Sequence, residues 1–208
     1  MDKLNDADIR KVLYESFTTR DEFILDPTTI IVDELDVCFN SARVDIAVIN
    51  GKLHGFEIKS ERDNLERLPS QVECYNCLFD TMTLVLSEVH LSKARKIVPK
   101  WWGIECVVKK KTGVTLKKVR KNKVNPKVQA LELTQLLWRQ ELFDLLEEHS
   151  ITKGIKSKTR LELGKIASEN ICKDSIAIFV RKTLKNRKDW KALQLQQLCD
   201  DLQQLQPN

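Results

Sequence analysis

Residues 44–60 read VDIAVINGKLHGFEIKS, and this stretch decides the fold. Apolar residues alternate with other residues on both sides of Asn50-Gly51, which is the pattern of β-strands whose two faces differ. Asn50-Gly51 itself predicts a tight type I′ turn between the two strands. In the second strand the alternation puts Glu57 and Lys59 on one face. The sequence therefore predicts a β-hairpin that brings Asp45, Glu57 and Lys59 close together.

These three side chains are of the types that phosphodiester hydrolysis requires. Asp45 and Glu57 offer the hard oxygen ligands that bind Mg²⁺ or Mn²⁺. Lys59 could orient the attacking water or stabilise negative charge in the transition state. Solvated cross-strand charge pairs on a half-exposed sheet are the structural alternative. The apolar segments that flank both strands predict a buried hairpin, where unpaired acids would be costly, and so favour the catalytic interpretation.

An acid on one strand followed by Glu-x-Lys on the next resembles the PD-(D/E)XK nuclease superfamily, with Asp45, Glu57 and Lys59 in the matching positions. Downstream, Gln71 and Tyr75 are similar to the Gln-x-x-x-Tyr motif of its RecB-like branch. The resemblance implies a restriction-endonuclease-like core, with a mixed central sheet flanked by helices. It also implies a Mg²⁺- or Mn²⁺-dependent deoxyribonuclease of DNA repair, recombination or defence against foreign DNA. Gln71 and Tyr75 would then help to position Lys59 and the DNA backbone.

Further site residues are expected from the same resemblance. Glu15, on a predicted first helix, and Glu34, on a predicted strand, are the two candidates for an additional metal ligand, and either could instead be a surface charge. Arg67 lies in the loop before the motif helix and is a candidate phosphate contact. The position before Asp45 is Val44, where the pattern that names the superfamily has proline.

The remaining patterns predict an α/β core over residues 1–124. Short apolar strands are expected at 83–86 and 104–108, with a helix over 90–98 between them, which is the arrangement of a right-handed parallel crossover. An edge strand rich in lysine is expected at 114–119.

From residue 130 onward, helical spacing replaces strand signals and predicts an all-α C-terminal domain over 125–208. A long helix is expected to about His149, followed by short helices at 161–169 and 176–184. Between Lys153 and Lys191, twelve Lys or Arg residues stand against four acids, so this domain is basic. The two short helices could form a helix-turn-helix or a lid on the core. Beyond them, the leucines could dock intramolecularly, pair with a protein partner or support self-association; they are Leu195, Leu198, Leu202 and Leu205.

The composition predicts a cytoplasmic protein that binds DNA and does not associate with a membrane. The 208-residue chain has a formal net charge of +5. No apolar run approaches the ~18 residues that span a bilayer, and the N-terminus lacks the pattern of a secretory signal. The six cysteines lack the spacing of a disulfide scaffold, so metal-free buried thiols are expected, Cys74-x-x-Cys77 included. A catalytically silent nucleic-acid-binding or adaptor module of the same fold is the alternative function.

Overall fold

A mixed seven-stranded sheet forms the centre of the computed structural model, which describes residues 3–110, 113–187 and 192–194. The strands are β1 (Ile30–Val37), β2 (Ala42–Ile49), β3 (Leu53–Lys59), β4 (Thr81–Ser87), β5 (Gly103–Lys110), β6 (Gly113–Arg120) and β7 (Ala192–Gln194). Their order in the sheet is β6-β5-β4-β3-β2-β1-β7. The β3–β4 and β4–β5 pairs are parallel, and the other pairs are antiparallel.

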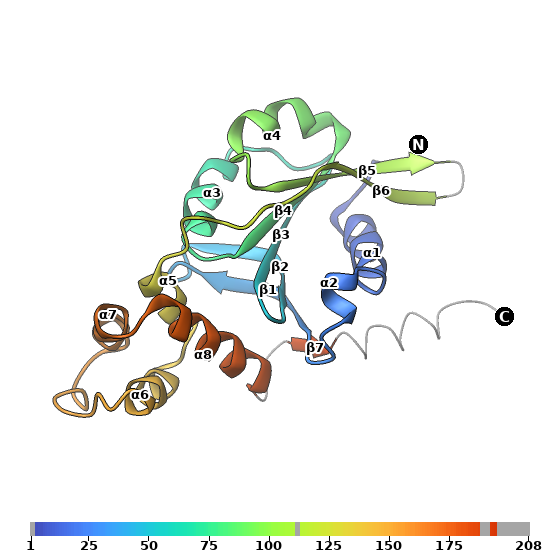
Figure 1. Ribbon diagram of the computed structural model, residues 1–208. Helices are drawn as coiled ribbons and strands as arrows, with labels where there is room; N and C mark the ends of the chain where they lie inside the picture. Colours follow the sequence, from blue (N-terminus) through green and yellow to red (C-terminus); the bar gives the residue numbers. More distant parts are fainter. Residues whose placement is uncertain (1–2, 111–112, 188–191, 195–208) are drawn as a thin grey trace.

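Helices cover both faces of this sheet (Figure 1). One face is covered by α1 (Asp6–Phe17) and α2 (Asp21–Ile24), and the other by α3 (Leu68–Asn76) and α4 (Leu91–Ile97). A short 3₁₀ helix (Glu88–His90) leads from β4 into α4. Two apolar clusters result, one between α1 and the sheet and one on the α3 side. The predicted mixed α/β architecture with a helix-flanked sheet is therefore confirmed. No helix among the described residues is long and apolar enough to cross a membrane.

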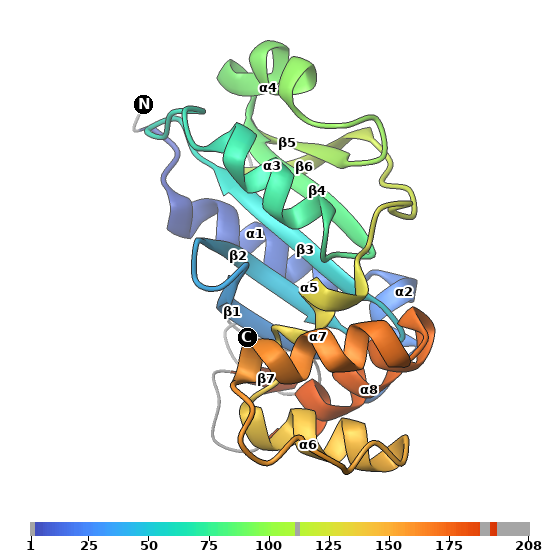
Figure 2. The same ribbon diagram turned by 90° about the vertical axis from the view of Figure 1, so that its left-hand side faces the viewer.

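The C-terminal part of the chain packs four helices beside β1 and β2 (Figure 2). They are α5 (Ala130–Thr134), α6 (Arg139–Glu148), α7 (Arg160–Asn170) and α8 (Lys173–Asn186). Their buried leucines, isoleucines and valine belong to the same apolar cluster as α3 and the sheet. The boundary expected near residue 124 thus lies in the connection after β6, and the segments on either side of it share one core.

Two predictions for this part of the chain are wrong. The expected long helix to His149 is broken after Thr134, because Arg160 donates to the carbonyls of Gln135 and Leu137, which a continuous helix would use internally. Strand structure also returns at β7, which pairs antiparallel with β1 and extends the sheet. The leucines expected to dock or self-associate, from Leu195 onward, lie outside the described residues.

The hairpin of β2 and β3 forms as predicted, but its turn does not. Neither Asn50 nor Gly51 has the positive φ that a type I′ turn requires. Instead, the Asn50 side chain accepts the N–H of Lys52 at 2.9 Å and donates to the carbonyl of Glu22 at 2.7 Å. The Asn50 side chain thus closes the turn between the strands and links that turn to α2.

A disulfide joins Cys38 to Cys74, so the expectation of six free thiols is wrong. Cys38 lies in the turn after β1 and Cys74 on α3, 36 residues apart in sequence and 6.1 Å apart between Cα atoms. Only the tertiary fold brings them together, which is why their spacing gave no signal. Among the described residues the free thiols are Cys77, Cys106 and Cys172, whereas Cys199 lies outside them.

Replacing Cys38 by serine is expected to lower the free energy of unfolding by about 2–4 kcal/mol, because the cross-link restricts the unfolded chain. The measurement is urea unfolding in oxidising buffer, followed by tryptophan fluorescence, to which the buried Trp102 contributes. Addition of a reductant should bring the wild type to the stability of Cys38→Ser.

Cys172→Ser is the matched control, since this thiol is exposed and free. It should unfold with the wild-type midpoint in both buffers. Equal midpoints for wild type and Cys38→Ser under oxidising conditions would show that the bridge does not stabilise the fold.

Candidate functional site

The site lies where β2 and β3 part from each other. Their ladder runs from Ile49↔Leu53 to Ile46↔Phe56 and goes no further toward Asp45 and Glu57. The Asp45 carboxylate fills the gap, and its Oδ2 accepts the N–H of Ile58 at 2.6 Å. A side chain therefore takes the place of a ladder carbonyl, and this holds the Asp45 carboxylate between the two strands.

The neighbouring pair of strands is also irregular at this position. The β1–β2 ladder omits Glu34 and Asp45, and Glu34 has a φ of +52°. A left-handed backbone costs a non-glycine residue roughly 1–3 kcal/mol and needs support from its surroundings. As a result Val32 and Leu35, on either side of the irregularity, both face the α3-side cluster. Asp33 and Glu34 both turn their carboxylates toward α1.

Glu57 is the most buried acid of the site and has three side-chain partners. It is 1% exposed. Its Oε1 accepts from Lys59 Nζ at 2.6 Å and from Gln71 Nε2 at 2.6 Å, and its Oε2 lies 3.0 Å from the Tyr75 hydroxyl. Burial raises the pKa of Glu57, and the adjacent Lys59 partly opposes that shift. The two motifs of the sequence thus meet on one carboxylate.

The helix α3 supplies two of these partners because of its spacing. Gln71 and Tyr75 are four residues apart and share one face of the helix with the buried Leu68 and Val72. The Tyr75 hydroxyl also lies 2.8 Å from the carbonyl of Arg43. Oε1 of Gln71 is buried and accepts no hydrogen bond from any residue that the structure describes.

Arg10, on α1, contacts the acids from the other side of the site. Its Nη1 donates to Asp33 Oδ1 at 3.2 Å and to the Asp45 carbonyl at 3.1 Å. Its Nη2 donates to Glu34 and lies 3.5 Å from Asp45 Oδ1, while Nε donates to Asp6 at 2.6 Å. Burial, and then the charge of Glu57, raise the pKa of Asp45 to about 7, although Arg10 and Lys59 favour its ionised form.

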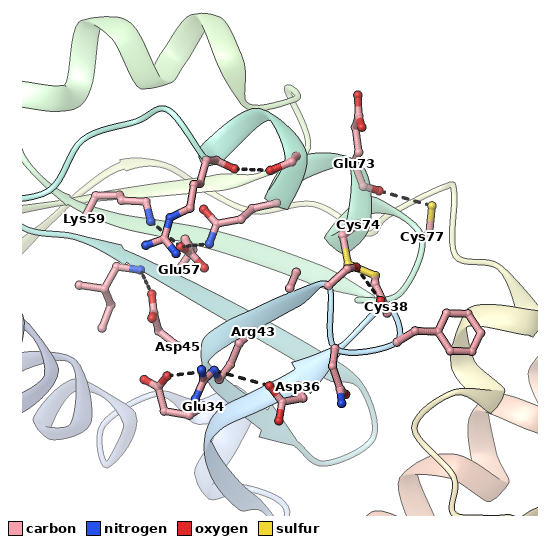
Figure 3. Close-up of a pocket in the computed structure, with 18 of the residues that line it drawn as sticks. Glu34, Asp36, Cys38, Arg43, Asp45, Glu57, Lys59, Glu73, Cys74 and Cys77 are labelled. Carbon is pink, nitrogen blue, oxygen red and sulfur yellow. Dashed lines mark hydrogen bonds and ion pairs between the residues drawn. A yellow bond between two sulfur atoms is a disulfide. The ribbon is translucent and has the colours of Figure 1, made fainter. Parts of the chain in front are cut away.

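Asp45, Glu57, Lys59 and Gln71 line a pocket of about 900 Å³ (Figure 3). Eight acidic side chains line it, against the three basic side chains of Arg43, Lys59 and Arg67. The acids are Asp6, Glu34, Asp36, Asp45, Glu57, Asp63, Glu73 and Glu132. The disulfide forms part of the same wall, on the side away from Lys59. The pocket is therefore strongly acidic although the whole chain is basic.

The fold gathers most of the residues that the sequence singled out. Asp45, Glu57, Lys59 and Gln71 line the pocket, and Tyr75 joins them through Glu57. The candidates outside the two motifs differ in position, because Glu34 and the exposed Arg67 line the pocket, whereas Glu15 is exposed on α1 and does not.

Sequence reasoning singled out Glu15 on the first helix and missed the two residues of α1 that contact an acid at the site, Arg10 and Tyr14. Arg10 contacts Asp33, and the Tyr14 hydroxyl donates to the same carboxylate, with burial as the main cause of a raised Tyr14 pKa. Asp6, Arg10 and Tyr14 are spaced four residues apart and form a polar stripe along one helix. This stripe is the feature of the sequence from which a polar contact of α1 with the site could have been predicted.

Comparisons with known proteins relate the chain to a phage protein. The family described as bacteriophage P4 protein cII matches residues 2–206. Protein cII of Enterobacteria phage P4 is 29% identical over 157 residues, which cover 76% of this chain and 59% of that protein, so the chain spans about three fifths of its relative's length. A solved structure of a protein of unknown function from Silicibacter pomeroyi is similar over 76% of this chain and 100% of that chain, at 12% identity and a TM-score of 0.42. Because the family match includes nearly every residue, the chain belongs to the bacteriophage P4 protein cII family.

Proposed function

We propose that this protein is a Mg²⁺- or Mn²⁺-dependent nuclease that hydrolyses DNA phosphodiester bonds, with a PD-(D/E)XK, restriction-endonuclease-like core. The observation that carries the proposal is the convergence of Lys59, Gln71 and Tyr75 on the buried carboxylate of Glu57. The hairpin motif and the helix motif are separate in sequence. Their meeting at one carboxylate is what a common catalytic role requires, and perturbed buried acids of this kind concentrate at functional sites.

The charges of the site support a requirement for a cation. Burial is the main cause of the raised pKa values of Asp45 and Glu57, so the ionised form of each acid is unfavourable although Lys59 lies nearby. A divalent ion would stabilise both ionised forms. It would also offset the excess of acids in the pocket, which otherwise repels a DNA phosphate.

The donor set fits Mg²⁺ or Mn²⁺ with two protein carboxylates. The described residues contain no group of three or more His, Cys, Asp or Glu side chains arranged to hold a metal ion. Mg²⁺ at phosphate-processing sites uses one or two carboxylates, with waters and substrate phosphates as its other ligands. Asp45 and Glu57 would hold the ion, which when bound supplies a polarised phosphoryl oxygen and a more acidic water. The buried Oε1 of Gln71 is an acceptor that such a water could satisfy.

The remaining side chains act on the nucleophile and the substrate. Lys59 keeps its ammonium group next to Glu57 and would orient the attacking water or stabilise charge on the phosphoryl group. Gln71 and Tyr75 hold Glu57 in place and are positioning residues. Arg67 lies exposed at the pocket, where it would contact a phosphate of the DNA backbone. Repair, recombination and defence against foreign DNA all use this chemistry.

The first test is cleavage of circular single-stranded and linear duplex DNA with Mg²⁺, Mn²⁺ or a chelator. Replacing Lys59 by methionine should lower the rate roughly 10²-fold or more, because it removes a charge that acts on the transition state. Lys93→Ala is the control and should cleave at the wild-type rate, since Lys93 is exposed on α4 and does not line the pocket. Circular dichroism of both variants would verify their folding.

Loss of all cleavage in the chelator is part of the expected result. Metal-independent cleavage, or equal rates for wild type and Lys59→Met, would contradict the proposed mechanism. DNA binding without cleavage in either metal would favour the catalytically silent nucleic-acid-binding module.

A second test uses the pH dependence of protein stability in the presence of a metal chelator. The pKa of Asp45 is about 7 in the folded state against 3.8 as the ordinary value, so between about pH 4 and pH 7 the folded state binds more protons than the unfolded state. The free energy of unfolding should therefore fall as the pH rises through this window, by up to ~1.4 kcal/mol per pH unit from this group. Urea unfolding across the window measures the slope.

Asp45→Asn is the matched variant because it lacks the titrating group. Its stability should decline less with pH than that of the wild type, and added Mg²⁺ should flatten the wild-type profile by stabilising the ionised carboxylate. Parallel stability profiles for the two proteins in chelator would show that the pKa of Asp45 is not raised in the folded state.

A further inference from the structure

We propose that the guanidinium of Arg10 takes the place of a second metal ion, so that the site binds one divalent cation and not two. The inference rests on the proposed function, because it concerns how many ions the nuclease site holds. Two-metal sites place their ions about 3.5–4 Å apart and share carboxylates between them. In this protein the guanidinium of Arg10, on α1, would occupy one of the two cation positions.

The contacts of Arg10 are those of a fixed cation. Its side chain is 20% exposed, and every nitrogen of the guanidinium has an acidic side chain within 3.5 Å. These carboxylates come from α1, β1 and β2, and they belong to Asp6, Asp33, Glu34 and Asp45. A guanidinium has five N–H donors in a rigid planar fork, so a group held on all three nitrogens has one orientation.

Asp45 divides its two oxygens between the two halves of the site. Oδ1 lies 3.5 Å from Arg10 Nη2, whereas Oδ2 accepts the N–H of Ile58, next to Glu57 on β3. With an ion held by Asp45 and Glu57, the Asp45 carboxylate would be shared between that ion and Arg10, as carboxylates are shared in two-ion sites. One of the two cation positions already carries the positive charge of Arg10.

The backbone of Glu34 gives an independent reason to assign this role. A regular strand would send Asp33 and Glu34 to opposite faces, but the φ of +52° at Glu34 brings both carboxylates to Arg10. Strain of this size persists where the surroundings enforce it. Glu34 is therefore a positioning residue for the guanidinium and not a ligand of the metal ion.

Counting bound Mn²⁺ tests the inference, by isothermal titration calorimetry and electron paramagnetic resonance on the full chain without DNA. The wild type should bind one ion. Arg10→Gln should bind two, because removal of the guanidinium frees Glu34 and one oxygen of Asp45. Arg10→Gln combined with Glu34→Gln should bind one again. Lys11→Gln, an exposed neighbour on the same helix, should keep the wild-type count.

Glu34→Gln alone separates the inference from its closest rival without removing Arg10. If Glu34 were a metal ligand, this change should weaken Mn²⁺ binding by more than about 10²-fold, which is beyond the ~10–10²-fold cost of losing an outer partner of a ligand. We expect a loss of no more than about 10²-fold, because Asp45 and Glu57 remain as ligands and Asp6, Asp33 and Asp45 still contact Arg10. A larger loss of affinity would overturn the inference even if Arg10→Gln did not fold.

The outcomes also separate this inference from the proposed function. Two ions in the wild type, or one ion in folded Arg10→Gln, would overturn the role of Arg10 and leave the nuclease proposal standing. No ion in the wild type but one in Arg10→Gln would identify the arginine as a block on a single site and would also overturn it. No ion in any variant would remove the metal-dependent function itself.

Discussion

The site depends on the burial of one carboxylate, that of Glu57. An acid that is 1% exposed is stable in ionised form only if its surroundings supply charge and hydrogen bonds. Lys59 supplies the charge because it is two residues further along the same strand and so shares its face. Gln71 and Tyr75 supply the hydrogen bonds, and they can do so only when α3 lies against β3. The packing of α3 through its apolar side is therefore also what completes the polar site.

A second constraint keeps the pocket open beside this carboxylate. The strands β2 and β3 stop pairing at Asp45, and the irregularity at Glu34 interrupts the β1–β2 ladder at the same level. Main-chain groups left without ladder partners are satisfied by side chains, as the bond from Ile58 N–H to Asp45 shows. The disulfide between Cys38 and Cys74 then ties the turn after β1 to α3. The outer wall of the pocket and the helix that carries Gln71 are thereby joined covalently.

Local patterns predicted the parts of the molecule that local physics determines. Alternation in residues 44–60 was sufficient for the hairpin, and a spacing of four was sufficient to place Gln71 and Tyr75 on one face. The errors lie where a distant partner decides the outcome. The turn at Asn50 is set by Glu22, the helix break after Thr134 by Arg160, and the disulfide by the approach of two segments. Arg10 was missed for the same reason, since its role depends on contacts with acids on two distant strands.

Charge links binding and chemistry under the proposed function. The chain is basic overall, yet the pocket presents eight acidic side chains against three basic ones. A DNA backbone would approach the protein readily but would be repelled from the pocket itself. Arg10 reduces this repulsion only in part, because it is already shared among four carboxylates. A divalent cation at Asp45 and Glu57 would then do two things at once, admitting the phosphate to the acidic pocket and activating it there. The requirement for metal in catalysis and the requirement for metal in binding the scissile phosphate are, on this view, the same electrostatic requirement.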